Sequence, residues 1–405
     1  KKKKKNKTQN RACDAMTITS TLECIDILTP PPNPQAAEQD IAWNCAWSPD
    51  GKLLASCHGK DVYIWQRQQQ EEQGSGSSKT ANNEWKCIAE LSEVHERTVR
   101  CVAFSPCGRI LASASFDGTV GIWECGKNAT NNNWECTAQL EGHESEVKSV
   151  CWNSTGTLLA TCGRDKAVWI WECILPLPGS YNSQPCEFEC IAVLHGHAGD
   201  VKSVVFAPSN GQFGDGEDVL FSASYDDTVK CWAEDAGDWY CAATLKGHES
   251  TVWTVAAAPG GARLVSGSDD CSLGIWKCYT AAEQANTTNN NQQQNTCNNG
   301  NSKDGLWKCV GMLSSAHTRT IYSVHCAPAR AGHGRIASVG ADDVLHVYRE
   351  VCGSSSDAPK FERDVSVPAA HAGDVNCVRW NPRDGALLAT TGDDGLVRIW
   401  RYHLR

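Results

Sequence analysis

The feature that most constrains the fold of this 405-residue sequence is a segment that recurs seven times. Each copy begins with a Val-rich run, continues through a Pro, Gly or Asp turn and an LLAS-like run, and ends in a third run that closes on Trp or Tyr. Turn residues between short alternating apolar runs are typical of β-strands. The copies occupy residues 43–65, 94–123, 142–171, 196–232, 247–276, 316–348 and 370–400.

A fourth strand is predicted from a short Trp-Cys pattern that lies between the repeats. It reads EWKC at 84–87, WEC at 134–136, EFEC at 187–190, DWYC at 238–241 and LWKC at 306–309. Four strands per repeat, with Gly-His and terminal Trp marks, are the pattern of WD repeats. The sequence therefore predicts an all-β fold, a seven-bladed WD-repeat β-propeller.

The two ends of the repeat array predict how the ring closes. The stretch LECIDIL, at 22–28, has the fourth-strand pattern but precedes the first repeat. The last repeat ends at Trp400 and has no fourth strand after it. We expect strand 22–28 to complete the last blade, which removes two open sheet edges, and residues 21–402 to form one propeller.

Several segments carry no pattern of this kind. Residues 1–20 are predicted to be a disordered Lys-rich tail, with translation starting at Met16. Asn-, Gln- and Ser-rich stretches at 66–83, 126–133 and 280–305 are predicted to be disordered insertions between the third and fourth strands of a blade. Without residues 1–15, the net charge of −10 becomes about −16, which argues against direct, nonspecific nucleic-acid binding.

Membrane and secretory signals are not seen in the sequence. No run approaches the roughly 18 apolar residues of a membrane span, and no apolar signal-peptide core follows the N-terminus. We therefore expect no membrane association and a cytosolic or nuclear location. The 23 cysteines are then most simply reduced thiols.

Five repeats contain a His, a Ser or Thr, an Asp and a Trp at matching positions. A Ser/His/Asp set could suggest a hydrolase, but a hydrolase needs one set. We interpret the five sets, called tetrads below, as buried hydrogen-bonded structural networks and expect no catalytic residue. They are His95/Ser113/Asp117/Trp123, His143/Thr161/Asp165/Trp171, His197/Ser222/Asp226/Trp232, His248/Ser266/Asp270/Trp276 and His371/Thr390/Asp394/Trp400.

Two repeats depart from the tetrad pattern. The sixth has Tyr348 in place of Trp, beside His317, Ser338 and Asp342. The first lacks the matching His and Asp, so its blade is expected to be the loosest.

The recurring cysteines could be metal ligands, disulfide partners or strand residues. Cys87, Cys136, Cys190, Cys241 and Cys309 take one position per blade, which places them apart around the rim of a propeller. No C-x-x-C occurs, so no metal site or bound cofactor is expected from them. Disulfides between Cys125 and Cys136, or Cys173 and Cys190, stay open as alternatives to a role as small buried apolar residues.

The repeat alignment also predicts a partner-docking face. The long insertions open on one face, whereas the turns on the other face stay short. Cations and aromatic residues, which are frequent interface anchors, cluster on the second face in consecutive blades. The predicted docking residues are Arg100, Lys148, Arg164, Lys202, Phe116, Tyr225, Trp253 and Tyr322.

Several stretches resemble one family, the WD-repeat subunit of the cytosolic iron–sulfur protein assembly machinery. They include HERTVRCVAFSPCGRILASASFD at 95–117, LEGHESEVKSVCWNSTGTLLATCGRDKAVWIWE at 140–172, SASYDDTVK at 222–230, ATLKGHESTVW at 243–253 and HTRTIYSV at 317–324. The resemblance covers roughly 20–402, spacers excepted.

The resemblance implies a non-catalytic scaffold that joins a DUF59-like factor and a HEAT-repeat adaptor. Such a scaffold serves the insertion of [4Fe–4S] clusters into cytosolic and nuclear apoprotein clients. It also implies that Arg164, in the motif Cys162-Gly-Arg164-Asp165-Lys166, is functional. Two other classes stay open, an adaptor of another complex such as a ubiquitin ligase substrate receptor, and a direct cluster carrier, which the cysteine positions oppose.

Overall fold

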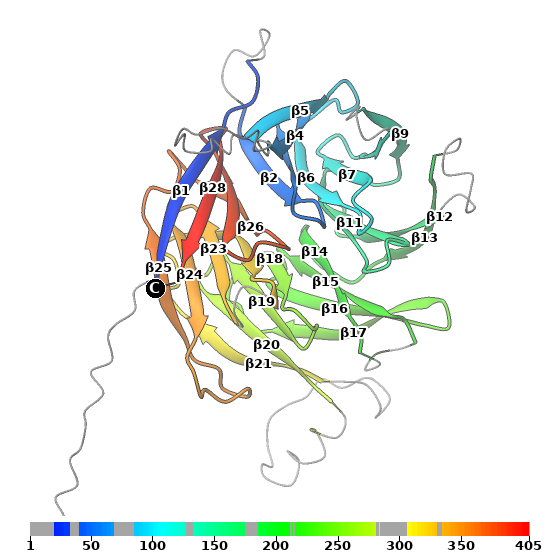
Figure 1. Cartoon of the computed structure of the whole chain (residues 1–405). Coiled ribbons are helices and arrows are strands. Elements are labelled where there is room, and N and C mark those ends of the chain that lie inside the picture. The colour runs from blue at the N-terminus through cyan, green and yellow to red at the C-terminus, as the bar shows by residue number, and fades with distance from the viewer. Residues whose placement is uncertain are drawn as a thin grey trace, which may run out of the picture.

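Seven four-stranded antiparallel sheets surround a common axis in the computed structural model, as the sequence predicts (Figure 1). The structure describes residues 20–32, 40–68, 85–126, 133–174, 185–210, 213, 215–280, 283, 306–329 and 334–404. The predicted tail before residue 20, its Met16 start and most of the three predicted insertions lie outside these ranges.

Each sheet is one blade, numbered here along the chain. Blade 1 contains β2 (Ala42–Trp47), β3 (Leu53–His58), β4 (Asp61–Arg67) and β5 (Trp85–Leu91). Blade 2 contains β6 (Val99–Phe104), β7 (Ile110–Ser115), β8 (Val120–Cys125) and β9 (Trp134–Leu140). Blade 3 contains β10 (Val147–Trp152), β11 (Leu158–Gly163), β12 (Val168–Ile174) and β13 (Glu187–Leu194).

The other blades repeat this order. Blade 4 contains β14 (Val201–Pro208), β15 (Asp218–Ser224), β16 (Thr228–Asp235) and β17 (Asp238–Lys246). Blade 5 contains β18 (Val252–Ala257), β19 (Arg263–Ser268), β20 (Leu273–Tyr279) and β21 (Leu306–Leu313). Blade 6 contains β22 (Ile321–Cys326), β23 (Ile336–Gly340), β24 (Leu345–Glu350) and β25 (Phe361–Val367). Blade 7 contains β26 (Val375–Trp380), β27 (Leu387–Gly392), β28 (Val397–His403) and β1 (Thr21–Leu28).

Blade 7 is built from both ends of the described chain, which confirms the predicted ring closure. Strand β1 pairs antiparallel with β28, and Leu22 lies opposite Tyr402 while Leu28 lies opposite Val397. Figure 1 shows β1 in blue beside β28 in red. The innermost strands β26 and β2 also contact each other, so the ring of first strands is continuous.

The hydrophobic core lies between neighbouring blades. The middle strand β7, ILASAS, is buried along its whole length, and its small residues allow the adjacent blade to approach closely. Ala112 and Ile122 of blade 2, for example, share one apolar cluster with Trp152, Leu159 and Trp171 of blade 3. The outermost strand β9 is mostly exposed between its buried ends. Burial is therefore greatest in the middle of a blade and least at the rim.

Helices contribute almost nothing to the described part of the chain. In those residues, no helix is both long enough and apolar enough to cross a lipid bilayer.

Candidate functional site

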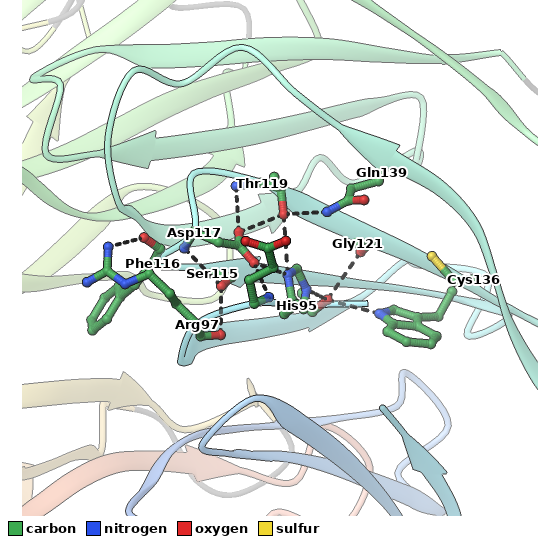
Figure 2. A network of polar contacts seen from close by, with 12 residues as sticks. His95, Arg97, Ser115, Phe116, Asp117, Thr119, Gly121, Cys136 and Gln139 are labelled. Atoms are coloured by element: carbon green, nitrogen blue, oxygen red, sulfur yellow. Dashed lines mark hydrogen bonds and ion pairs between the residues drawn. The ribbon is translucent and has the colours of Figure 1, made fainter. Parts of the chain in front are cut away.

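The five tetrads form the same hydrogen-bonded chain in blades 2, 3, 4, 5 and 7. In blade 2, His95 Nδ1 lies 3.1 Å from Asp117 Oδ2, and His95 Nε2 lies 2.7 Å from Ser113 Oγ. Trp123 donates its indole N–H to Ser113 Oγ at 2.9 Å. Figure 2 shows this network, in which His95 lies between Asp117 and the hydroxyl.

The other four tetrads repeat these contacts within narrow limits. The His–Asp distances are 2.6 Å for His143–Asp165 and 2.8 Å for His197–Asp226, His248–Asp270 and His371–Asp394. The indole of Trp171, Trp232, Trp276 and Trp400 donates to Thr161, Ser222, Ser266 and Thr390 at 2.8 to 3.0 Å. The spacing of these residue types in the repeat places them together because two turns carry the His and Asp and two adjacent strands of the blade carry the hydroxyl residue and the Trp.

Burial makes the tetrad hydroxyls unsuitable as nucleophiles. Ser113, Thr161, Ser222, Ser266 and Thr390 have no exposed surface, so no substrate can reach them in the folded blade. Their contribution is to satisfy the indole N–H and imidazole nitrogen, which would otherwise be buried without a partner.

The tetrad aspartates are held as carboxylates. Burial alone would raise the pKa of Asp117, but hydrogen bonds from His95 and Thr119 outweigh it and hold that pKa well below its usual range. Burial likewise opposes ionisation of Asp394, but the hydrogen bond from His371 favours it. The pKa of Asp394 falls to about 2. An ionised carboxylate accepts several bonds at once, so each aspartate also ties down its turn.

This turn places a side chain on the face of the propeller. The backbone N–H of Glu96 donates to Asp117 Oδ2 at 3.0 Å, and that of Thr119 donates to Asp117 Oδ1 at 2.9 Å. The adjacent Phe116 N–H donates to the carbonyl of Thr98 at 2.9 Å. The same bond joins Arg164 to Glu146 and Tyr225 to Asp200, so the buried tetrads position the predicted docking residues.

Five of the predicted docking residues meet around the propeller axis. They extend from the innermost strands and line one small pocket together with residues of all seven blades. These five are Arg100, Lys148, Lys202, Trp253 and Tyr322.

Aromatic rings lie beside each of the three inner cations. Arg100 lies over the ring of Trp43 at 5.1 Å from the centroid, and Lys148 lies over Phe116 at 4.9 Å. Lys202 lies 4.9 Å from the ring centroid of Trp253 and 5.5 Å from that of Tyr225. Such cation–π contacts fix the long side chains and reduce the entropy that a partner would have to remove.

Acidic neighbours reduce the positive charge predicted for this face. Lys148 Nζ lies 2.9 Å from Glu146, and Lys202 Nζ lies 3.4 Å from Asp200. Arg164 approaches Glu146 at 3.7 Å, but its side chain is 60% exposed. Burial is also the largest influence on Lys202, and it lowers the pKa of that amine. The most accessible predicted anchors are therefore Arg164 and Tyr225, the latter being 61% exposed.

The repeat pattern does not predict three further residues of this face. Trp43 lies in the first repeat, which has no complete tetrad, and the structure shows that its ring contacts Arg100. Arg97 and Arg319 take matching places in the motif His-x-Arg-Thr, at 95–98 and 317–320, which is the signal that could have identified them. Their side chains are 56% and 64% exposed and reach acids of the next blade, Glu146 and Asp374.

Charges of both signs lie on this face. Blades 2 and 3 present Arg97 and Arg164, blades 5 and 7 present Asp269 and Asp393, and Arg319 in blade 6 lies 3.8 Å from Asp374. A partner with an acidic segment would find complementary charge at the exposed arginines.

Blade 1 has a shorter version of the tetrad. His58, at the end of β3, lies 2.9 Å from Ser56, and Trp65 donates to the same hydroxyl at 2.8 Å. All three side chains are buried. The sequence predicts this blade to be the loosest because it lacks the tetrad His and Asp. That prediction does not consider His58, which lies at the end of β3 and not in the turn before the first strand.

Blade 6 departs further. His317 keeps its contacts with Asp342 and Ser338, at 2.8 and 2.7 Å. Tyr348 instead donates its hydroxyl to the carbonyl of Ala316 at 2.7 Å and makes no bond with Ser338. His346 is buried beside His317, and this burial lowers the pKa of His346 to about 3, so its ring is neutral.

The rim cysteines share one structural role. Each lies opposite the blade Trp, next to a register shift in the fourth strand, and its thiol donates to the carbonyl two residues later. The pairs are Cys24–Trp400, Cys87–Trp65, Cys136–Trp123, Cys190–Trp171, Cys241–Trp232 and Cys309–Trp276.

Neither disulfide considered from the sequence is formed. Trp134 lies opposite Cys125 and Phe188 lies opposite Cys173, and every cysteine among the described residues is a free thiol. The thiol of Cys173 instead makes a hydrogen bond with that of Cys186, and this bond raises the pKa of Cys173.

Comparison with known protein families gives one match. The model described as "WD domain, G-beta repeat" matches residues 35–66, 85–124, 134–172, 188–233, 239–277 and 363–401. These ranges leave out β22 to β24 of blade 6, where Tyr348 replaces the blade Trp.

Curated relatives match along almost the whole chain. The "Probable cytosolic iron-sulfur protein assembly protein Ciao1" of Culex quinquefasciatus is 42% identical over 89% of this chain and 94% of its own length. The "Probable cytosolic iron-sulfur protein assembly protein CIAO1 homolog" of Chlamydomonas reinhardtii is 42% identical over 90% of this chain and 96% of its own length. A "Probable cytosolic iron-sulfur protein assembly protein 1" of Neurospora crassa is 31% identical over 77% of this chain and 68% of its own length.

Proposed function

This chain belongs to the family of WD-repeat cytosolic iron–sulfur protein assembly proteins, and we propose that it acts there as a non-catalytic scaffold. In this role it supports insertion of [4Fe–4S] clusters into cytosolic and nuclear apoproteins. The observation that carries the proposal is the 42% identity to proteins of that name over about nine tenths of this chain.

The structure supports a scaffold role through its rigidity. A closed ring of seven blades, with buried tetrads tying down the turns of five of them, holds the docking residues in fixed positions. A surface organised before binding loses little conformational entropy when a partner docks. The tetrad hydroxyls are buried, so the Ser/His/Asp sets serve this rigidity and take no part in chemistry.

We assign the docking surface to the face that carries Arg164 and Tyr225. Arg164 is an accessible cation of blade 3, and Tyr225 is an accessible aromatic residue of blade 4. Arg100, Lys148, Lys202, Phe116, Trp253 and Tyr322 form the half-buried floor between them and the axis. Because the lysines are partly neutralised by their acidic neighbours, this floor binds anions less readily. Selectivity for a partner therefore depends on its shape and on its contact with Arg164.

The partners in this proposal are a DUF59-like assembly factor, a HEAT-repeat adaptor and iron–sulfur apoprotein clients. The proposed function involves neither a membrane nor direct contact with nucleic acid. The protein works in the cytoplasm, and in the nucleus where it serves nuclear clients. The cluster itself is cargo of the assembly. The six rim cysteines of blades 1 to 5 and 7 are separated by whole blades, so they cannot bind a common cluster.

Affinity purification of the tagged full chain, without oxygen, tests the proposal. We expect assembly factors and iron–sulfur apoproteins to co-purify with the wild type, and Arg164→Glu to lose apoprotein capture while keeping its melting temperature. Co-purification of ubiquitin ligase subunits in place of assembly factors would replace the proposal with the adaptor class that the sequence also allows. Stable binding of about one cluster per isolated chain would instead identify a carrier.

A further inference from the structure

Blade 6 holds a cluster of three side chains that the proposed function does not use. One ring nitrogen of His317, one of His346 and one carboxylate oxygen of Asp342 all lie within 4.8 Å of one another. His317 is 3% exposed and His346 is 5% exposed. Among the described residues, this is the single group of three His, Cys, Asp or Glu side chains with such spacing.

Two of the three residues belong to the common tetrad plan, and the third is particular to this blade. His346 lies opposite Ser338 in the ladder between β23 and β24. The matching positions, opposite the tetrad Ser or Thr, hold residues without an imidazole. They are Gly121, Trp169, Lys230, Gly274 and Arg398. Blade 6 therefore adds a second imidazole to a His–Asp pair that has a single imidazole in blades 2 to 5 and 7.

The second imidazole has an unused nitrogen. His346 Nδ1 is buried and has no hydrogen-bond partner, although its ring centroid is 4.6 Å from that of His317. A buried polar atom without a partner costs free energy, and such atoms are few in folded proteins. The tetrads do not explain this one, because Ser338 and Asp342 are already bonded to His317.

We propose that His317, Asp342 and His346 form a binding site for one divalent first-row transition metal, with zinc as the expected ion. Two imidazoles and one carboxylate are a donor set that zinc accepts, with its fourth position open to water or another oxygen. Thr318 is placed to help, since its hydroxyl lies 3.3 Å from Asp342 Oδ2 at the exposed side of the cluster.

Metal binding requires the three ligand atoms, now within 4.8 Å of one another, to adjust to the spacing of metal ligands. At bond lengths of about 2.1 Å, two ligand atoms of a tetrahedral zinc lie about 3.4 Å apart. His317 Nδ1 and Asp342 Oδ1, now hydrogen-bonded at 2.8 Å, must separate by about 0.6 Å. The expectation of no metal site rests on cysteine spacing, and it does not address these residues, which lie on two turns and a strand of blade 6.

Cobalt binding to the full chain provides the test. The protein is first treated with a chelator, and its exposed thiols are blocked with iodoacetamide so that cysteine does not contribute. Co²⁺ is then added while visible d–d absorption is recorded, and Zn²⁺ is titrated by calorimetry. We expect about one equivalent of each ion, and an X-ray absorption spectrum with only nitrogen and oxygen ligands at about 2.0–2.1 Å.

The variants decide whether this cluster is the site. His346→Gln should weaken metal binding at least about tenfold. If that variant folds poorly, His346→Gly is the second variant, because Gly occupies the matching positions 121 and 274. His58→Gln is the matched control, because His58 Nδ1 is also buried and unpartnered but has no place in the cluster. Unchanged binding in both His346 variants, equal loss in His58→Gln, or sulfur ligands in the spectrum would overturn the proposal.

Discussion

Cys24 of β1 lies opposite Trp400 of β28, so a residue near the start of the described chain and one near its end share a single ladder. Blade 7 thus depends on both ends of the chain. The neighbouring Leu28 is 3% exposed and belongs to the cluster that also contains Trp47 and Ile399.

Removing this strand should open the ring. Deletion of residues 1–28 leaves β28 with an unpaired edge, which lowers stability and promotes edge-to-edge association. We expect the melting temperature to fall by more than about 5 °C and soluble aggregates to appear in size-exclusion chromatography. Truncation of residues 1–15 is the control and should leave the melting temperature unchanged; an equal fall in both chains would contradict the assignment of ring closure to β1.

Asp165 and Arg164 are adjacent, yet their substitutions should act differently. Asp165→Ala removes the partner of His143 and costs about 1–3 kcal/mol or more, because a buried donor is left unpaired. Arg164→Glu alters an exposed side chain and should leave the thermal melt unchanged. Capture of partners should nevertheless weaken by about 2 kcal/mol or more, as for other interface anchors.

Thermal melts and pull-downs of both variants check this pair. An early melt of Arg164→Glu would make that residue structural. A normal melt with full capture would move the docking surface elsewhere, to the rim.

The hydroxyl of a complete tetrad should matter more than that of blade 6. Ser266→Ala leaves both the Trp276 indole N–H and His248 Nε2 without their partner, whereas Ser338→Ala affects His317 Nε2 alone, since Tyr348 bonds to Ala316. We expect Ser266→Ala to lower the free energy of unfolding by about 1 kcal/mol more than Ser338→Ala. Urea unfolding of the two variants measures this difference, and equal losses would show that the indole bond is unimportant.

Acid should destabilise the protein through its tetrad aspartates. The pKa of Asp394 is about 2 in the folded protein and about 3.9 in an unfolded chain, so the unfolded state binds more protons between these values. Its stabilising effect is complete above about pH 4 and is lost as the pH falls toward 2.

The Asp394→Asn variant tests this dependence. Free energies of unfolding, measured in urea between pH 5 and the lowest pH at which the protein stays folded, should fall less steeply in Asp394→Asn than in the wild type. Parallel pH profiles would show that Asp394 is not a source of the acid sensitivity.

The sequence alone determined the architecture of this protein, because its evidence is local and repeated. Alternating apolar runs, tight Asp turns and a terminal Trp specify strands and turns within one blade, and seven copies specify the number of blades. The tetrad of His143, Thr161, Asp165 and Trp171 follows from the same spacing, since a fixed strand length and turn bring these positions together. LECIDIL could be assigned to blade 7 because a repeat without a fourth strand must find one elsewhere.

Only the tertiary structure decided which side chains of the docking face and of blade 6 contact one another. Lys148 and Lys202 are counted as free cations in the sequence, but Glu146 and Asp200 pair with them, and aromatic rings lie beside both. The contact of Trp43 with Arg100 and the meeting of His346 with His317 and Asp342 belong to the same class. Such contacts depend on the relative rotation of packed strands and on rotamers set by neighbouring side chains, which the repeat pattern does not specify.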